Sequence, residues 1–285
     1  MKKVRKCVIP VAGMGTRFLP ATKATPKEML PIIDKPTLQY IVEEAVASGI
    51  EEILFITSPY KNSVLDHFDK SYELESRLRE SGKLDKLEII ENVSNLAKFY
   101  YMRQGSPKGS GHAIKLARSF VGNEPFAVMY GDDLMKSDTP VLKQLIDIYE
   151  KRDCNVIAVQ EVDRSLVYKY GIVEYENDEL KIKNIVEKPS VDEAPSNHAG
   201  LGRYIVKPEI FDELDKISKG AGDEYQFTDA MKALMQTQDF YACNFEGKYF
   251  DIGNQFGYIK ANIEYALDRE DIKDELYNYL VNKTK

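Results

Sequence analysis

Two cations follow a glycine turn near the start of the chain, and this arrangement suits a phosphate chain. The turn holds Gly13 and Gly15, and it lies between a predicted strand over 7–11 and the cations Arg17 and Lys27. Its backbone can approach a ligand closely because glycine lacks a Cβ atom. The N–H groups of such a turn can point at phosphate oxygens, and a guanidinium can bind them in a fork. The alternative is a strand-to-helix turn with two solvated charges, because short glycine motifs also occur by chance.

The same turn lacks the features of a dinucleotide-binding fingerprint. No third glycine follows at the required spacing, and Leu19-Pro20 interrupts any helix that should begin there. Pro26 and Pro31 flank Lys27, so we expect Lys27 on a loop and not in a helix. The stretch therefore predicts a phosphate-binding loop after the first strand.

A second glycine-rich stretch begins at Gln104 and precedes a helix predicted over 113–120. A glycine loop at a helix N-terminus suits an anionic or planar ligand. Gln104 carries both a donor and an acceptor, which binding to the edge of a nucleobase requires. Taken alone, the stretch favours a simple loop with a helix cap. We expect His112 to orient or cap its neighbours and not to act as a general base.

Adjacent carboxylates, Asp132 and Asp133, end a buried strand predicted over 126–130. In α/β sheets, ligands bind at the carboxyl ends of the strands. Carboxylate oxygens there favour Mg²⁺ held together with a phosphate. If the strand continues, the two side chains point in opposite directions, so we choose Asp132 as the direct ligand. Asp251 begins a second carboxylate–glycine corner, Asp251-Ile252-Gly253-Asn254.

A predicted β-hairpin over 170–175 and 182–186 ends in Glu187-Lys188-Pro189. The proline ends the strand and leaves a carboxylate and an ammonium in one place. The alternative is a surface ion pair, which contributes little to stability.

The elements between these stretches predict an α/β protein. A helical stripe from Leu38 to Val46 follows the first strand, Gly49 is placed to end that helix, and a strand over 53–57 comes next. Strand, helix and strand in this order imply a parallel sheet covered on both faces. The charged stretch 60–96 predicts two or three surface helices. Further strands are predicted over 98–104, 155–162, 200–206, 240–245 and 249–250, and further helices from 230, over 256–267 and over 272–281.

Length and composition exclude several other classes of protein. The 285 residues suffice for one large α/β domain, alone or with a smaller appendage. A net charge of −7 disfavours extended nucleic-acid binding. No apolar run reaches membrane-spanning length, and no signal-peptide core follows Met1. Cys7, Cys154 and Cys243 have no metal-binding spacing, and we expect buried thiols in a reducing compartment, the cytoplasm.

Taken together, the motifs are more specific than any one of them. In chain order they are AGMGTRFLPATKATPKEMLP, YMRQGSPKGSGHA, YGDD, YGIV, VEKP and YFDIGN. This series resembles the bacterial UTP–glucose-1-phosphate uridylyltransferases of the sugar nucleotidyltransferase superfamily, and the resemblance covers nearly the whole chain. Six motifs in one order make a chance match negligible.

The resemblance implies a Rossmann-like three-layer α/β/α fold with a mixed, mainly parallel central sheet and a smaller sugar-binding β region. It also implies a single domain over 1–285. Within that domain, the nucleotide-binding part covers about 1–135, the sugar-binding part about 155–254, and the C-terminal helices 255–285.

The resemblance further implies that UTP and α-glucose 1-phosphate react to give UDP-glucose and pyrophosphate, with Mg²⁺ as cofactor. The implied nucleotide-binding residues are Ala12, Gly13, Gly15, Gln104, Gly109 and Asp132, of which Gln104 and Gly109 contact the uracil edge. The implied catalytic cations are Arg17 and Lys27 at the UTP phosphates and Lys188 at the sugar phosphate. Gly171, Glu187 and Lys188 are implied for the sugar side, and Asp132 and Asp251 for Mg²⁺.

Two alternatives to this function stay open at this point, and so does the oligomeric state. A sister transferase could use dTTP or another hexose 1-phosphate, since one methyl and one hydroxyl separate thymidine from uridine. A catalytically silent subunit that binds a nucleotide sugar is a second possibility, although the cations and acidic residues needed for catalysis are all present. The terminal helices favour a homodimer or a homotetramer without distinguishing the two.

Overall fold

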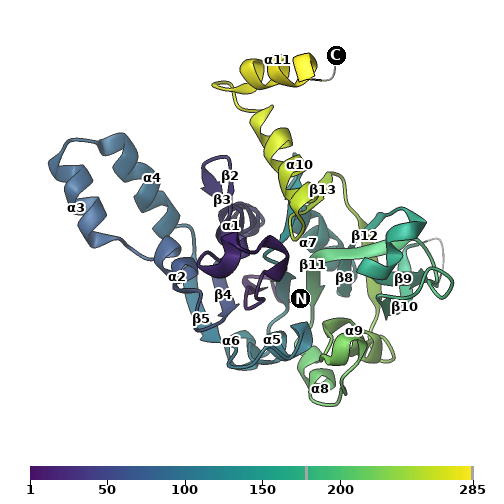
Figure 1. Ribbon diagram of the computed structural model, residues 1–285. Helices are drawn as coiled ribbons and strands as arrows, with labels where there is room; N and C mark the ends of the chain where they lie inside the picture. The colour runs from purple at the N-terminus through teal and green to yellow at the C-terminus, as the bar shows by residue number, and fades with distance from the viewer. Residues whose placement is uncertain (177–178, 284–285) are drawn as a thin grey trace.

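The structure, a computed structural model, describes residues 1–176 and 179–283. Within these residues, nine strands form one sheet in the order β5-β4-β1-β6-β11-β8-β12-β10-β9 (Figure 1). They are β1 (Lys6–Pro10), β4 (Glu52–Thr57), β5 (Lys98–Arg103), β6 (Phe126–Met129), β8 (Asn155–Glu161), β9 (Gly171–Tyr175), β10 (Lys181–Glu187), β11 (His198–Val206) and β12 (Phe240–Asn244). All of them except β10 and β11 run the same way, which confirms the predicted mixed, mainly parallel sheet.

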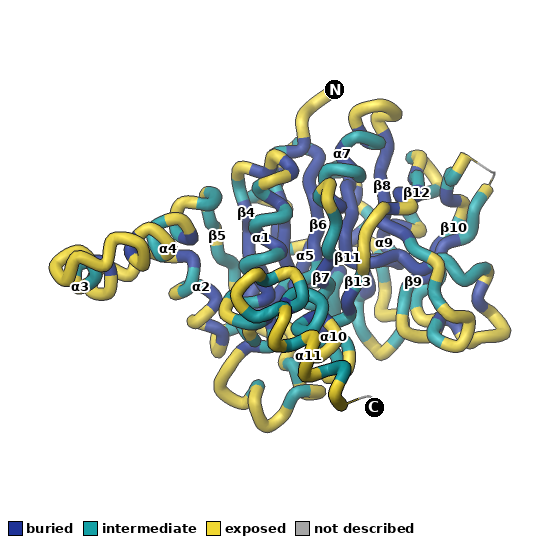
Figure 2. Tube along the Cα trace, turned by 90° about the horizontal axis from the view of Figure 1, so that it is seen from above, coloured by how far each residue is buried: buried dark blue, intermediate teal, exposed yellow. Residues whose placement is uncertain are grey.

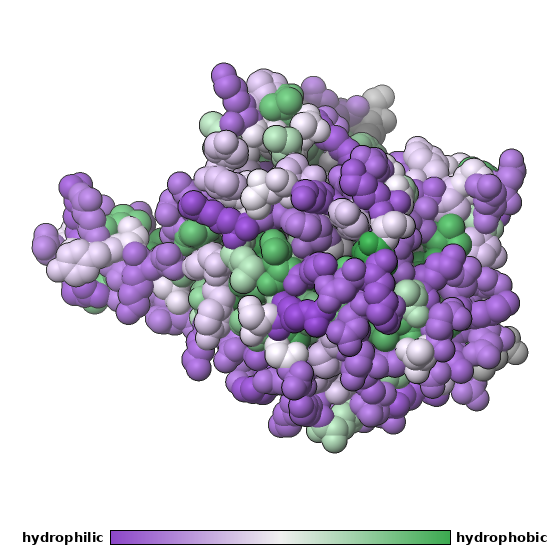
Figure 3. Space-filling model, turned by 90° about the horizontal axis from the view of Figure 1, so that it is seen from below, coloured by the Kyte–Doolittle hydropathy of each residue, from purple (hydrophilic) through white to green (hydrophobic). Residues whose placement is uncertain are grey.

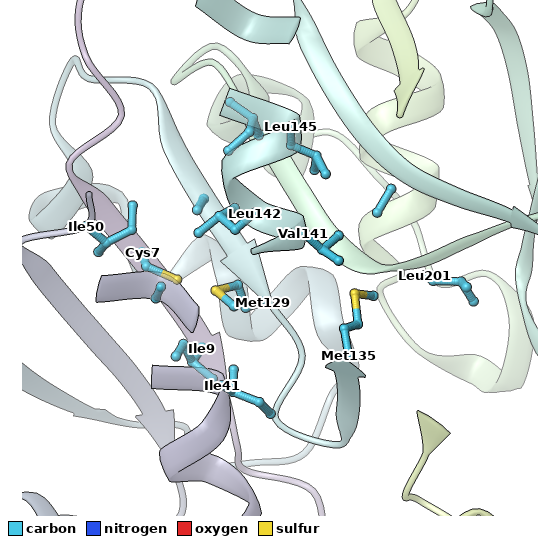
Figure 4. Close-up of a cluster of buried hydrophobic side chains, with 14 of the residues drawn as sticks. Cys7, Ile9, Ile41, Ile50, Met129, Met135, Val141, Leu142, Leu145 and Leu201 are labelled. Carbon is cyan, nitrogen blue, oxygen red and sulfur yellow. The ribbon is translucent and has the colours of Figure 1, made fainter. Parts of the chain in front are cut away.

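Helices cover both faces of this sheet, so the predicted three-layer architecture is also confirmed. The helices are α1 (Thr37–Ala47) and α7 (Val141–Arg152) on one face, and α5 (Ser110–Lys115), α8 (Ile210–Leu214) and α9 (Phe227–Leu234) on the other. Side chains of β1 alternate between the two layers. Cys7 and Ile9 pack with Ile41 and Leu142 in one cluster (Figure 4), whereas Val8 belongs to the opposite one. Figure 2 shows the buried strands at the centre of the molecule.

The predicted surface helices after residue 60 form an arm that projects from the sheet edge (Figures 1 and 2). They are α2 (Asn62–Phe68), α3 (Tyr72–Glu80) and α4 (Leu84–Ser94). Val64 and Phe68 are buried at the base of the arm, while Tyr72 and Leu84 are exposed farther out. Hydrophilic residues cover most of the face drawn in Figure 3, with the arm at its left. Packing against the sheet therefore stabilises the arm mainly at its base.

Two small sheets and the C-terminal helices complete the fold. The sheets pair β2 (Pro31–Ile32) with β3 (Lys35–Pro36) and β7 (Asp133–Lys136) with β13 (Lys248–Asp251). The helices are α10 (Gln255–Ala266) and α11 (Lys273–Lys283). No residue of α11 is buried, and residues 284–285 of the predicted C-terminal part lie outside the described residues. In the described chain, no helix is long and apolar enough to cross a membrane.

Lys27 does not lie on an irregular loop as predicted, but in a short 3₁₀ turn over Lys27–Met29. Pro26 is extended, as a proline before the turn requires, and its carbonyl accepts a hydrogen bond from Met29 N at 2.9 Å. The prediction that proline keeps Lys27 out of an α-helix holds, but a single turn of 3₁₀ helix needs only this one bond.

Two predicted helix boundaries are also wrong. The helix expected over 113–120 is two helices, α5 and α6 (Arg118–Val121), separated by a tight turn. The helix expected from 230 is α9, which already begins at Phe227. Its first N–H donates to the hydroxyl of Ser110 at 3.1 Å. A distant residue thus satisfies a helix terminus that the local sequence leaves without a partner.

Candidate active site

A cleft of about 790 Å³ opens where β1, β5 and β6 end. All the predicted site residues except Gly15 line it: Ala12, Gly13, Arg17, Lys27, Gln104, Gly109, Asp132, Gly171, Glu187, Lys188 and Asp251. Gly15 is not among the lining residues, but a Cβ there would lie 3.2 Å from the Cβ of Lys27. Segments far apart in the sequence therefore converge on one cavity, at the carboxyl ends of parallel strands.

Lys27 and Asp132 form an ion pair in this cleft. Burial alone would raise the pKa of Asp132, but the ammonium of Lys27 and the nearby Arg17 hold it below its ordinary value. Burial would likewise lower the pKa of Lys27, yet the carboxylates of Asp132 and Glu28 raise it. Both groups are therefore charged at neutral pH.

Glu28, which the sequence analysis did not select, also lines the cleft and interacts electrostatically with Lys27. It is 1% exposed, and its Oε2 accepts a hydrogen bond from Lys61 Nζ at 2.7 Å. Burial raises the pKa of Glu28 and lowers that of Lys61, and each charge offsets part of the shift in the other. Because Glu28 follows Lys27 in the same 3₁₀ turn, this buried ion pair fixes the turn to the base of the helical arm.

We expect Lys61→Met to destabilise the protein by about 3 kcal/mol, because it leaves the Glu28 carboxylate buried without its partner. The double variant Glu28→Gln, Lys61→Met removes both charges and should regain part of the loss. The free energy of unfolding from urea denaturation measures both effects. A single variant as stable as the parent would show that the ion pair contributes nothing to stability.

Arg17 and Asp251 meet at the second acidic corner. The Arg17 guanidinium donates to the Gly253 carbonyl at 3.4 Å, and the side chain of Gln255 donates to the carbonyl of Arg17. Carboxylate oxygens of Asp132 and Asp251 each lie 3.0 Å from the position that a Cβ on Gly253 would occupy. The two carboxylates therefore face one small space, and their oxygens fit a hard divalent cation such as Mg²⁺.

Asp133 also lines the cleft, which the sequence analysis did not expect. Strand β6 already ends at Met129, so the strand alternation that would turn Asp133 away does not continue. Burial and the negative charge of Asp132 raise the pKa of Asp133 to about 7. Tyr249 donates a hydrogen bond to this carboxyl group at 2.6 Å. Gly202 leaves room for it, since a Cβ at that position would lie 2.0 Å from Asp133 Oδ2.

Residues of β9, β10 and α9 also line the cleft. Glu187 Oε2 accepts a hydrogen bond from the Thr228 hydroxyl at 2.9 Å, while Oε1 lies 3.3 Å from Lys188 Nζ. Lys188 has a φ of 47°, a left-handed conformation that is uncommon for a residue with a Cβ. Such strain collects at functional sites, because surrounding structure must enforce it. Here the backbone N–H of Lys188 donates to the Tyr170 carbonyl at 2.9 Å.

Comparison with known proteins agrees with this arrangement. The family model described as nucleotidyl transferase matches residues 6–267. The chain belongs to this family. A UTP–glucose-1-phosphate uridylyltransferase of Staphylococcus haemolyticus is 51% identical over 98% of this chain and 98% of the relative.

Solved structures extend the similarity to the fold. A crystal structure of UDP-glucose pyrophosphorylase complexed with UDP-glucose is 43% identical and has a TM-score of 0.85, covering 93% of this chain and all of that one. A UTP-bound UGPase from Acinetobacter baumannii is 37% identical, with a TM-score of 0.87 over 99% of this chain and all of that one. The family and fold predicted from the six motifs are thus confirmed. Nucleotidyl transferases generally use a divalent metal ion.

Proposed function

We propose that this nucleotidyl transferase makes UDP-glucose and pyrophosphate from UTP and α-glucose 1-phosphate. One observation carries the proposal: the cations Arg17 and Lys27, the amide of Gln104 and the Glu187–Lys188 pair all line a single cleft. Such a cleft offers separate contacts for a triphosphate, a base and a sugar phosphate. The relative at 51% identity carries the name of this activity, and similar structures contain UDP-glucose and UTP.

In the proposed reaction the sugar phosphate attacks the α-phosphorus of UTP, and pyrophosphate leaves on the opposite side. A phosphate is already an anionic nucleophile at pH 7, so the reaction needs no general base. The barrier arises from bringing two polyanions together in line. Arg17, Lys27 and Lys188 lower it by neutralising charge and fixing the positions of the phosphates.

We propose Asp132 and Asp251 as ligands of Mg²⁺. When bound, the ion would neutralise phosphate charge and hold the triphosphate in one conformation. Among the described residues, no group of three or more His, Cys, Asp and Glu side chains could hold a metal by itself. Phosphate oxygens and water would supply the remaining ligands, as is usual for Mg²⁺. The Lys27 ammonium, now paired with Asp132, would then be available to a phosphate.

We further propose that the chain works as one domain, with nucleotide binding mainly in 1–135 and sugar binding mainly in 155–254. The single sheet that contains strands of both parts supports one domain. Within it the strands of the first part, β5-β4-β1-β6, stand together beside those of the second, β11-β8-β12-β10-β9, which supports the division. We also propose that the protein forms a homodimer or a homotetramer. Tyr277 and Tyr279 on α11 support this, because they are 61% and 58% exposed and could pack against a partner.

We propose a cytoplasmic location as well. The buried, unpaired thiols of Cys7, Cys154 and Cys243 support it.

Pyrophosphate release from the purified protein with Mg²⁺ and glucose 1-phosphate tests the proposal. We expect strong release with UTP and little with ATP, CTP or GTP. Comparable release with dTTP would favour the broader sister transferase. If no nucleotide gave pyrophosphate release while UDP-glucose still raised the melting temperature, the result would contradict the proposed enzyme activity and indicate a binding subunit.

A further inference from the structure

Gln104 is held at the cleft wall by two side-chain hydrogen bonds and one backbone bond. Its Nε2 lies 2.8 Å from Nδ1 of His112 and 3.3 Å from the carbonyl oxygen of Gly109. Its backbone N–H donates to the Thr57 carbonyl at 2.7 Å. The residue is only 6% exposed, yet it lines the cleft. The Gln104 side chain is therefore held in one orientation toward a ligand in the cleft.

The partners decide which end of the amide faces the cleft. A carbonyl oxygen only accepts, so the Gln104 atom beside Gly109 must be the amide nitrogen. That nitrogen carries two hydrogens, and Gly109 and His112 take one each. Nδ1 of His112 is therefore an acceptor, and the imidazole is neutral with its proton on Nε2. The oxygen Oε1 of Gln104 is left as the group that can accept from a base.

Contacts of the surrounding backbone hold the Gly109 carbonyl in one position. Gly109 has a φ of 101°, and a Cβ there would lie 2.5 Å from the Tyr225 carbonyl oxygen. The neighbouring N–H groups tie the same loop to that segment, with Gly111 N donating to Tyr225 O at 2.8 Å and Tyr225 N donating to Lys108 O at 2.9 Å. Gly109 thus cannot turn its carbonyl away from Gln104 without breaking these contacts.

We propose that His112 is a positioning residue that fixes the Gln104 amide, so that the cleft accepts uracil and rejects cytosine. The inference rests on the proposed function. Uracil carries an N–H donor at N3, which complements the Gln104 oxygen. Cytosine carries a lone pair at N3, which that oxygen repels. Thymine has the same N3–H as uracil, so His112 does not distinguish UTP from dTTP.

Without an acceptor at Nδ1, one Gln104 hydrogen loses its partner, and only the longer bond to the Gly109 carbonyl, at 3.3 Å, still holds the amide. With the shorter of its two bonds lost, the amide rotates away from this orientation in a fraction of the molecules and presents its nitrogen to the base. The buried amide would then complement cytosine better and uracil worse. The two nucleotides should respond in opposite directions, whereas general damage to the fold would weaken both. The ratio of kcat/KM for UTP to that for CTP therefore isolates the positioning effect.

The test compares His112→Phe, which keeps a ring without nitrogen, with His112→Asn, whose side-chain oxygen can take the place of Nδ1. We expect the UTP-to-CTP ratio to fall about tenfold or more in His112→Phe. In His112→Asn the ratio should stay within about threefold of the parent. Melting temperatures check folding, and His112→Leu replaces the phenylalanine variant if that variant does not fold.

If the parent uses UTP and His112→Phe leaves the UTP-to-CTP ratio of kcat/KM unchanged, the inference is overturned. A parent that used no nucleotide would instead contradict the proposed function. A second measurement needs no variant of His112: the ¹⁵N chemical shifts of its ring in the parent protein. We expect Nδ1 in the unprotonated range and Nε2 in the protonated range at neutral pH, and the reverse assignment would also overturn the inference.

Discussion

Replacing Asp132 with asparagine will lower turnover by about a thousandfold or more at ordinary Mg²⁺ concentrations. The substitution keeps the size of the side chain but removes the charge that faces the same space as Asp251. It also releases Lys27 from its ion pair. A metal ligand and an ion-pair partner differ in one respect: only loss of the ligand changes how turnover depends on the metal concentration.

Turnover of Asp132→Asn should therefore be measured over a wide range of Mg²⁺ concentrations. We expect half-maximal activity to need much more Mg²⁺ than in the parent. Asp138→Asn serves as the matched control, because Asp138 is an exposed carboxylate on the loop after β7 and does not line the cleft. Turnover within tenfold of the parent, with the same Mg²⁺ dependence, would contradict the metal role of Asp132.

Lys188→Ala will lower kcat/KM for glucose 1-phosphate about 30- to 100-fold, the size expected for one lost charge-assisted hydrogen bond. Lys188 lines the part of the cleft where Glu187 accepts a hydrogen bond from Thr228. We therefore expect the KM for the sugar phosphate to rise, with little change in the KM for UTP.

Initial rates at varied concentrations of each substrate separate these two effects. Lys183→Ala is the matched control on β10, the strand that Lys188 directly follows, because the Lys183 side chain is 63% exposed and contacts Glu174 at 3.2 Å, outside the cleft. It should leave both KM values unchanged. An equal effect of Lys188→Ala on both substrates would contradict a specific role at the sugar phosphate.

The residues that the sequence identified correctly share a simple property. Val8, Leu54 and Val128 lie on strands whose apolar runs are buried on both faces, so the strands could be predicted from local pattern alone. Asp132 follows such a strand, Gln104 follows the partly exposed edge strand β5, and the carboxyl ends of parallel strands meet at one edge. The cleft could therefore be predicted from the order of strands and polar loops.

The residues that were missed depend on contacts between distant segments. Lys61 reaches Glu28 across 33 positions, and Thr228 reaches Glu187 across 41. Nothing near Lys61 or Thr228 in the chain indicates a partner, since only packing of α2 and α9 brings Lys61 to Glu28 and Thr228 to Glu187. Glu28 had a weak signal, because a carboxylate directly follows the predicted cation Lys27. The Asp133 side chain is predicted to point away from the site only if the strand that ends at Met129 continues through it, and it does not.

Direct transfer between the two substrates is the central claim, and rapid-quench measurement of pyrophosphate tests it most directly. Enzyme, Mg²⁺ and labelled UTP are mixed first without, and then with, glucose 1-phosphate. We expect no pyrophosphate from UTP alone, and equal amounts of pyrophosphate and UDP-glucose once the sugar phosphate is added. A burst of pyrophosphate equal to the enzyme concentration before that addition would reveal a uridylyl-enzyme and contradict the account.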